Sequence, residues 1–413
     1  MDEKKAENAM HTNPLVTIVV PVYNGANYMR EAIDSALCQT YPYIEIIVVN
    51  DGSSDNTRDI ALSYGNKIRY FEKENGGVST ALNLAIREMK GDYFSWLSHD
   101  DMYYPDKVQV EIDALRESGN MLQAVYSASE NLVMPENRIK SNSVRWLNSY
   151  GKYVSVGALL PVFGLISGCT LLIPKQYFRE RGMFDESLRA VQDYKLWFQM
   201  FHDKRLIYVD KPLVKSRVHA LQVTNTYDKR LDEENWLYCW MVESVEMKDL
   251  QGSGLDLYQF LGAAIAKLYV SRRTASDLAL KRLRTLPETP NAEKLRMRFA
   301  DYLEGYGGNG IYLYCMGKRA ISAIVSLRMR GIAIDGVSDI APHKHGKLIE
   351  GLVCIAPAQI PSESLIIITK RYPEDAEKML CEMGYRHIIA YDDLAQWIIE
   401  TPVMKDQLQD FAQ

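Results

Sequence analysis

Short apolar runs alternate with amphipathic stretches along the first third of the chain. The runs expected to form strands are Thr17–Val20, Ile44–Val49, Ile68–Phe71, Tyr93–Leu97 and Gln123–Ser127. Between them, apolar residues recur at helical spacing, as Met29, Ile33 and Leu37 do. This alternation predicts βαβ crossovers, and therefore an α/β fold with a mostly parallel sheet and helices on both faces.

The pattern changes near residue 227. Residues 227–304 are rich in Leu, Glu, Lys and Arg at helical spacings, which predicts a helical connector. Strand and helix signals alternate again after the glycine-rich segment at Gly305–Gly310, so a second, smaller α/β domain is expected there. The predicted organisation is a flexible tail at 1–13, a first α/β domain at 14–226, the connector at 227–304 and the second domain at 305–413.

Composition narrows the class of protein. The chain has 413 residues, of which 47% are hydrophobic, so disorder over most of its length is excluded. Its net charge is −5, and it lacks the basic surplus with which nucleic-acid-binding proteins meet phosphates. We therefore expect no nucleic acid among its partners.

Cysteine spacing and apolar runs bear on the compartment. The six cysteines form no C-x-x-C pair, which is typical of free thiols in a reducing compartment. The N-terminus shows no secretory signal, and the charge-free stretch Val156–Pro174 is interrupted by Pro161 and Gly164. We read that stretch as a buried strand plus loop rather than a membrane span. A cytoplasmic protein is expected, and peripheral contact with the inner face of a membrane and self-association both stay open.

Candidate chemistry follows the predicted strands. The segments after the first four strands are Pro21–Gly25, Asn50–Asp55, Glu74–Gly77 and Ser98–Asp101. Parallel strands present their carboxyl ends at one edge of the sheet, where ligands of α/β folds bind. Glycines allow backbone N–H groups to approach a ligand closely, and paired acids suit a hard divalent cation. Each segment alone is an ordinary turn, but four in register indicate a nucleotide site with a metal.

These residues also carry a family resemblance. The segments T-I-V-V-P-V-Y-N-G, E-I-I-V-V-N-D-G-S-S-D-N-T and W-L-S-H-D-D-M-Y-Y-P-D-K resemble the inverting family-2 glycosyltransferases of the GT-A fold, over about residues 14–224. The resemblance implies a nucleotide-sugar donor, here a UDP-sugar, and a divalent metal, Mn²⁺ or Mg²⁺. It also implies a glycan or lipid-linked saccharide acceptor, as in bacterial surface polysaccharide synthesis.

The resemblance assigns roles to individual residues. The residues that match nucleotide-sugar contacts are Pro21, Tyr23, Asn24, Asp51, Asn75, Asp100 and Arg217. The residues that match metal ligands are Asp100, Asp101 and His219, and Asp193 matches the catalytic base of an (E/D)-D-Y motif. The chain departs from the commoner pattern at Ser98 and at Gln192, where acids are usual. Metal binding would then depend on Asp100 and Asp101.

The last hundred residues resemble Rossmann-like modules found beside sugar-modifying enzymes. Strand and helix meet at Cys315-Met316-Gly317, a degenerate dinucleotide fingerprint with Cys315 in place of the first glycine. Asp335 and Asp339 follow the next predicted strand, where an acid would meet a ribose. A structural, partner or acceptor-handling role and a small nucleotide or sugar ligand are both open for this domain.

Two other functions compete with sugar transfer. A sugar-nucleotide nucleotidyltransferase would need a basic first loop to hold a triphosphate, and here no Lys or Arg occurs in that loop before Arg30. A non-catalytic nucleotide-sugar-binding module would explain Ser98 and Gln192 as losses. The presence of Asp100, Asp101 and Asp193 favours the enzyme.

Overall fold

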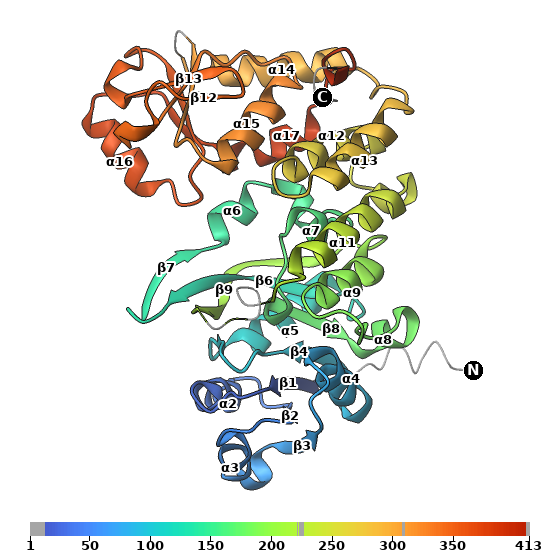
Figure 1. Cartoon of the computed structure of the whole chain (residues 1–413). Coiled ribbons are helices and arrows are strands. Elements are labelled where there is room, and N and C mark those ends of the chain that lie inside the picture. Colours follow the sequence, from blue (N-terminus) through green and yellow to red (C-terminus); the bar gives the residue numbers. More distant parts are fainter. Residues whose placement is uncertain (1–12, 221, 223–226, 308–309, 410–413) are drawn as a thin grey trace. The chain divides into compact units, whose positions relative to one another are not determined.

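The chain folds as two compact units (Figure 1). The computed structural model describes residues 13–220, 222, 227–307 and 310–409, with side chains undescribed at 140–142 and 409. Unit 1 comprises Met1–Asn148 and Val154–Leu237, and unit 2 comprises Ser149–Tyr153 and Tyr238–Gln413. The tail predicted at 1–13 lies, except for Asn13, outside the described residues. The boundary between the units follows Leu237 and falls inside the helix Arg230–Ser244, the first helix of the predicted connector. Most of that connector therefore belongs to unit 2.

Unit 1 contains one large sheet with helices packed on it. Its strands are β1 (Val16–Val22), β2 (Ile44–Asp51), β3 (Arg69–Lys73), β4 (Tyr93–Trp96), β5 (Met102–Tyr103), β6 (Val125–Val133), β7 (Arg138–Asn142), β8 (Leu171–Pro174) and β9 (Ile207–Val218). Its helices are α2 (Met29–Leu37), α3 (Thr57–Leu62), α4 (Val78–Glu88), α5 (Lys107–Ser118), α6 (Val144–Asn148), α7 (Leu159–Phe163), α8 (Lys175–Arg181), α9 (Gln192–Phe201) and the first half of α11 (Arg230–Ser244).

The sheet order is β3-β2-β1-β4-β8-β6-β9-β5, with β7 paired to β6. Strands β1 to β4 are parallel, and β1 is buried along its whole length, as its run of β-branched residues predicts. The predicted strand at Gln123–Ser127 overlaps the start of β6. Strand β8 lies between β4 and β6 and is antiparallel to both, so the sheet is parallel on one side and mixed on the other.

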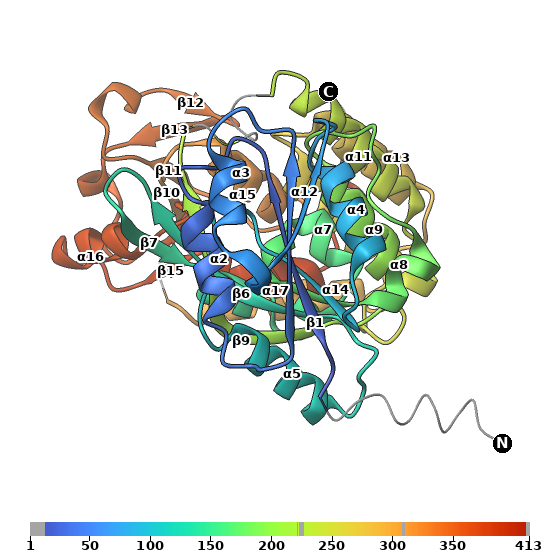
Figure 2. The same ribbon diagram turned by 90° about the horizontal axis from the view of Figure 1, so that it is seen from below.

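Helices cover both faces of the parallel part. Right-handed crossovers place α2 and α3 on one face as the chain moves outward from β1 to β3. The connection from β3 back to β4 then brings α4 to the opposite face, as Figure 2 shows. All four parallel strands end at the same edge of the sheet, which we call the carboxyl edge.

The charge-free stretch at residues 156–174 contains more than the expected strand and loop. It forms the short helix α7 before β8 begins at Leu171. Pro161 lies within the first turn of α7, where proline is tolerated, and Gly164 ends it with a φ of 70°. Within the described residues, no helix of either unit is long and apolar enough to cross a bilayer.

Unit 2 has a smaller sheet of its own. Its strands are β10 (Ile311–Tyr314), β11 (Gly336–Ser338), β12 (Leu348–Ile349), β13 (Leu352–Ile355), β14 (Leu365–Ile368) and β15 (Ile388–Ala390). Its helices are the end of α11, α12 (Leu257–Leu268), α13 (Arg273–Arg284), α14 (Ala292–Glu304), α15 (Lys318–Arg328), α16 (Glu374–Glu382) and α17 (Ala395–Glu400).

The order of this sheet is β12-β13-β11-β10-β14-β15, and all strands but β12 are parallel. Counted in chain order, the parallel strands run 3-2-1-4-5, the order of doubly wound nucleotide-binding folds. Alternate residues of β14 face two separate cores: Ile367 packs with α15 and α14, and Ile366 packs with α16. This placement of helices on both faces agrees with the α/β pattern of the sequence.

A buried ion pair lies inside unit 1 next to the end of β4. Lys107 Nζ lies 2.8 Å from a Glu111 carboxylate oxygen on helix α5, and both side chains are fully buried. The ammonium also lies 4.4 Å from the centre of the Tyr103 ring, and its Nζ donates to Ser95 Oγ on β4. Burial raises the pKa of Glu111 to about 7, and Lys107 opposes that rise. Each of these two buried groups therefore stabilises the charged form of the other.

Glu111→Gln is expected to lower the free energy of unfolding by about 3–5 kcal/mol, because it leaves Lys107 charged, buried and unpaired. Urea denaturation measures this change. Glu117→Gln, an exposed position on the same helix, is the control and is expected to change stability by less than about 0.5 kcal/mol. The double replacement Lys107→Met/Glu111→Leu should recover most of the loss. Equal stability of Glu111→Gln and the control would contradict the role given to the pair.

Candidate functional site

The loops after β1 and β2 are joined to each other at the carboxyl edge. Asn24, with a φ of 48°, donates its backbone N–H to Ser53 Oγ at 2.8 Å. Its side-chain Oδ1 accepts from the Ser54 backbone N–H at 2.8 Å. Asp55 accepts from the backbone N–H of Ala26, and Thr57 Oγ1 accepts from that of Gly25. Asn24 therefore shapes this loop with its own side chain, a use that the sequence did not reveal.

Pro21 and Tyr23 lie in different surroundings at the end of β1. Pro21 is a buried residue of β1, whereas the Tyr23 side chain is 51% exposed. An exposed phenol ring beside this edge is available to stack on a planar ligand.

Asp51 holds the loop that follows β3. Its Oδ1 accepts from Lys73 Nζ at 2.6 Å and from the Gly76 N–H at 3.0 Å, and its Oδ2 accepts from the Gly77 N–H at 2.7 Å. Asn75 is exposed at the tip of this loop. Gly52, with a φ of 72°, leaves no room for a Cβ, which would lie 2.6 Å from the Asn75 backbone nitrogen. The loop and the end of β2 thus form one rigid unit.

Asp100 and His219 meet after β4 and β9. His219 Nε2 lies 3.0 Å from Asp100 Oδ2, and both side chains are about one-seventh exposed. Ligands adjacent to each other in an octahedral shell with bonds of about 2.1 Å lie about 3 Å apart, so this pair fits two coordination positions of Mg²⁺ or Mn²⁺. Within the described residues, no three His, Cys, Asp or Glu side chains gather into a complete metal site. Such a cation would need its remaining ligands from a diphosphate and water.

Asp101 is turned into the protein. Its Oδ1 accepts from the Arg217 backbone N–H at 2.8 Å, and the residue is 8% exposed. Burial and the adjacent Asp100 raise the pKa of Asp101 to about 7, while hydrogen bonds from Arg217 and Cys169 oppose the rise. Ser98, at the position where the family often has an acid, contacts the buried Cys169 thiol, with 3.3 Å between Oγ and Sγ. The polar group at position 98 therefore faces inward.

The Arg217 guanidinium is also fully engaged. It is 2% exposed, donates Nε to the Asp100 carbonyl at 2.9 Å and pairs through Nη2 with Glu31 at 3.0 Å. It lies 4.2 Å from the centre of the Tyr28 ring. The sequence indicated a phosphate contact for Arg217, but in this geometry it anchors the loop that carries Asp100. Glu31 and Tyr28 were not foreseen, because the spacing of α2 shows only helical periodicity.

Asp193 lies in the first turn of α9 and is partly buried. Its Oδ1 accepts from the Tyr194 backbone N–H at 2.8 Å. Burial raises the pKa of Asp193 to about 6, because that hydrogen bond only partly offsets the loss of solvent. Gln192 beside it is buried, and its Oε1 has no hydrogen-bond partner within the described part of the chain.

Arg189 connects the start of α9 to the carboxyl edge. Arg189 lies four residues before Asp193, and its Nη1 donates to the Gly76 carbonyl at 2.9 Å. The backbone N–H groups of Arg189 and Ala190 donate to the Glu233 carboxylate of α11, at 3.1 and 2.8 Å to Oε2. No sequence signal marks Arg189 or Glu233, since neither belongs to a spaced motif. Arg189 and Glu233 therefore fix the segment that carries Asp193. Arg189 also joins this segment to the Gly76 loop, which is the loop that Asp51 holds.

The degenerate fingerprint of unit 2 has a distinctive geometry. Cys315 takes a φ of 78°, a conformation that glycine adopts at lower cost. Asp339 Oδ2 accepts from the Met316 N–H and from Lys344 Nζ, so the acid that could meet a ribose is already bonded. Asp335 accepts from the Ile311 N–H. The Rossmann-like character and the ligand of this unit stay predictions.

Comparisons with known proteins place the chain among sugar transferases. Residues 17–181 match the family model described as glycosyl transferase family 2. An uncharacterized glycosyltransferase of Rickettsia typhi is 49% identical over 253 residues, which cover 60% of this chain and 78% of that protein. The chondroitin synthase of Pasteurella multocida is 26% identical over 272 residues, which cover 65% of this chain and 27% of that protein.

The fold has a counterpart among solved structures. The crystal structure of Staphylococcus aureus TarS 1–349 in complex with UDP-GlcNAc is similar with a TM-score of 0.50 and 16% identity, over 70% of this chain and 81% of that one. This likeness confirms the α/β fold of the GT-A kind that the sequence predicts for residues 14–226. Sequence and fold together show that the chain belongs to glycosyl transferase family 2 and is a transferase of sugars.

Proposed function

We propose that the protein is an inverting, metal-dependent glycosyltransferase that moves a sugar from a UDP-sugar to a glycan or lipid-linked saccharide. One observation carries the proposal: a carboxylate of raised pKa, Asp193, is tied through Arg189 to the same loop of the carboxyl edge that Asp51 holds. A base for an acceptor hydroxyl thus lies on a segment anchored to the nucleotide edge. The relationship to a chondroitin synthase supports a polysaccharide or related acceptor.

The donor would bind along the carboxyl edge. Tyr23 offers an exposed ring for the base, and the loops held by Asn24 and Asp51 offer backbone groups in fixed positions. Asn75, exposed at the tip of its loop, can contact the nucleotide directly. Because Asp51 already accepts three hydrogen bonds, its main contribution would be to hold this loop in shape.

Asp100 and His219 would hold the divalent cation, and the buried Asp101 would fix the Arg217 backbone beside them. When bound, the cation neutralises charge on the departing diphosphate. Arg217 would act as a positioning residue, since its guanidinium bonds the Asp100 carbonyl and its backbone N–H bonds Asp101. Reaching a phosphate would require it to give up Glu31.

Asp193 would accept the proton of the acceptor hydroxyl. As that proton leaves, the hydroxyl oxygen forms a bond to the anomeric carbon and the bond from that carbon to the diphosphate oxygen breaks. One displacement inverts the anomeric configuration, and one base is enough for it. A pKa of about 6 suits the task, because the group is ionised near neutral pH and is still basic enough to take a proton.

The two alternatives make different predictions for simple assays. A non-catalytic module would bind UDP-sugar without releasing UDP in the presence of Mn²⁺ and acceptor. A nucleotidyltransferase would release pyrophosphate from UTP and a sugar phosphate. The proposed enzyme releases UDP, and screening UDP-sugars by UDP release identifies the donor.

Contact with a membrane surface and self-association stay predictions.

Asp193→Asn is expected to lower kcat by about 10²–10⁴-fold, because the amide cannot take the acceptor proton. UDP-sugar affinity, measured by calorimetry, should stay within about twofold, since the side chain keeps its size and its backbone contact. Asp203→Asn, which removes a carboxylate paired with Arg181 at the other end of α9, is the matched control. Near-normal transfer by Asp193→Asn would refute the assignment.

The pH dependence gives a second readout of the same residue. Only ionised Asp193 can act as a base, so kcat/KM at saturating Mn²⁺ should fall tenfold per pH unit below about pH 6. This acid limb should be absent from the residual activity of Asp193→Asn. A structural role for Asp193 would leave the limb in place.

His219→Ala is expected to raise the Mn²⁺ concentration needed for half-maximal activity by at least about tenfold, because the mutation removes a direct ligand. The measurement is a Mn²⁺ titration of the transfer rate at saturating donor. His343→Ala, an exposed histidine of unit 2, serves as the control. An unchanged Mn²⁺ titration in His219→Ala would show that the Asp100–His219 pair is not the metal site.

A further inference from the structure

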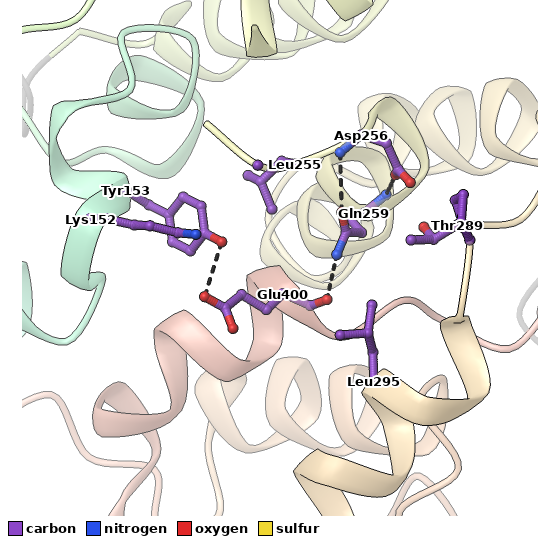
Figure 3. Close-up of a pocket in the computed structure, with 10 residues that line it drawn as sticks. Lys152, Tyr153, Leu255, Asp256, Gln259, Thr289, Leu295 and Glu400 are labelled. Carbon is purple, nitrogen blue, oxygen red and sulfur yellow. Dashed lines mark hydrogen bonds between the residues drawn. The ribbon is translucent and has the colours of Figure 1, made fainter. Parts of the chain in front are cut away.

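Unit 2 contains a cavity of about 440 Å³ that no sequence motif marks. Its walls come from four segments of this unit: Lys152 and Tyr153, the turn that leads into α12 with the first turn of that helix, the loop before α14 with the first turn of α14, and the end of α17 (Figure 3). The volume lies within the range of roughly 300–1,000 Å³ that is usual for small-molecule pockets. The cavity is distinct from the carboxyl edge of unit 1, which holds Asp100 and Asp193.

Hydrogen bonds between these segments fix the walls in place. Glu400 Oε1 accepts from Tyr153 Oη and from Gln396 Nε2, each at 3.0 Å. Gln259 donates its side-chain Nε2 to the Glu400 carbonyl and accepts from the Asp256 N–H at 3.1 Å. Asp256 in turn caps α12 by accepting from the Gln259 N–H at 2.8 Å. The polar lining is therefore organised before any ligand arrives, which lowers the entropic cost of binding.

Two polar groups of the lining remain available to a ligand. Thr289 is 8% exposed, and its hydroxyl oxygen is buried with no hydrogen-bond partner among the residues that the structure describes. Figure 3 shows this side chain on the cavity wall opposite Glu400. Within the same residues, the hydrogen bonds of Glu400 use its Oε1 or its carbonyl, which leaves Oε2 open to a ligand. A buried hydroxyl without a partner is costly, so a ligand that bonds to it gains free energy.

The charge and apolar surface of the lining select the class of ligand. Two carboxylates, Asp256 and Glu400, face one ammonium, Lys152, so the lining is net acidic and disfavours phosphates and other anions. Leu255 and Leu295 add apolar surface, and Tyr153 adds an aromatic ring. Carboxylate and hydroxyl groups beside an apolar wall match a molecule with hydroxyls on its rim and C–H groups on its faces.

We propose that this cavity binds a neutral sugar unit of a glycan, with its hydroxyls bonded to Thr289 and Glu400 and its C–H face against Leu295. The proposal rests on the proposed function in one respect, because a glycan acceptor is what would bring sugar units to this protein. It adds a second saccharide site, in unit 2, to the site of transfer in unit 1.

The test is direct binding by the full chain without donor or metal. Saturation-transfer NMR is run with a panel of neutral monosaccharides and disaccharides built from glucose, galactose, mannose, rhamnose and their N-acetylamino forms. Thr289→Val removes the unpaired hydroxyl at constant shape, and Leu295→Trp fills the cavity. Thr285→Val, the same change at an exposed position four residues earlier, is the matched control.

At least one panel sugar is expected to bind to the wild type and to Thr285→Val with equal affinity. Thr289→Val should weaken that binding by about three- to tenfold, the effect of one lost neutral hydrogen bond, and Leu295→Trp should abolish it. UDP-sugar affinity should be the same in all four proteins, which separates this test from that of the transferase site. An unchanged thermal unfolding midpoint in each variant shows that unit 2 is folded.

Three results would overturn the proposal. They are the absence of binding by any panel sugar, sugar binding that survives both Thr289→Val and Leu295→Trp, and displacement of the bound sugar from the wild type by inorganic phosphate at a lower concentration than by a second neutral sugar. None of these results depends on whether the chain transfers sugar, so the proposed function could stand while this inference fails.

Discussion

The candidate active site depends on one buried cation, the guanidinium of Arg217. It comes from the end of β9, yet it bonds the Asp100 carbonyl after β4 and the Glu31 carboxylate on α2, and the backbone N–H of the same residue bonds Asp101. Three segments distant in sequence are therefore held by one residue. Arg217 is almost fully buried, so its guanidinium would be costly to leave unpaired, whereas the Glu31 carboxylate that pairs with it is about half exposed. The acidic loop is consequently rigid, and Asp100 is fixed beside His219.

A second set of polar contacts organises the start of α9, next to the loop after β3. Glu233 holds the backbone before α9, and Arg189 reaches from that backbone to the Gly76 carbonyl. Asp193 then lies in the first turn of a helix whose entry is fixed at two points. Burial, rather than a neighbouring charge, raises its pKa. The two carboxylates thus differ in character: Asp100 is paired with a histidine, and burial raises the pKa of Asp193.

Much of the fold of unit 1 could be predicted from sequence, because a buried parallel sheet leaves a strong pattern. The run Ile44–Val49 appears as β2, and each of the first four loops follows its strand at the carboxyl edge. The insertion of β8 between β4 and β6 could not be predicted, since pairing between strands so far apart in sequence leaves no local signal. The division between the two units after Leu237 leaves no sequence signal for a related reason, because helical periodicity continues across it within α11.

Candidate site residues can be predicted from sequence where they belong to a motif of acidic residues or histidine. They are harder to predict where their role depends on tertiary contacts with another residue. Motifs point to Asp100, His219 and Asp193 as site residues, which stays a prediction, and the structure places the first two in contact. Arg217 was found too, but its partners Glu31 and Tyr28 give it a positioning geometry that spacing cannot encode. Arg189, Glu233 and the Thr289 cavity have no motif, because each depends on tertiary contacts between separate segments.

The central claim is that a single displacement, with Asp193 as the only base, carries the sugar from donor to acceptor. The anomeric configuration of the product tests it most directly. With a UDP-α-sugar donor, proton NMR of the product formed in the first minutes should show only the β-linked anomeric signal. A product that retains the α configuration would contradict the account, because retention requires two displacements or attack from the face of the leaving group.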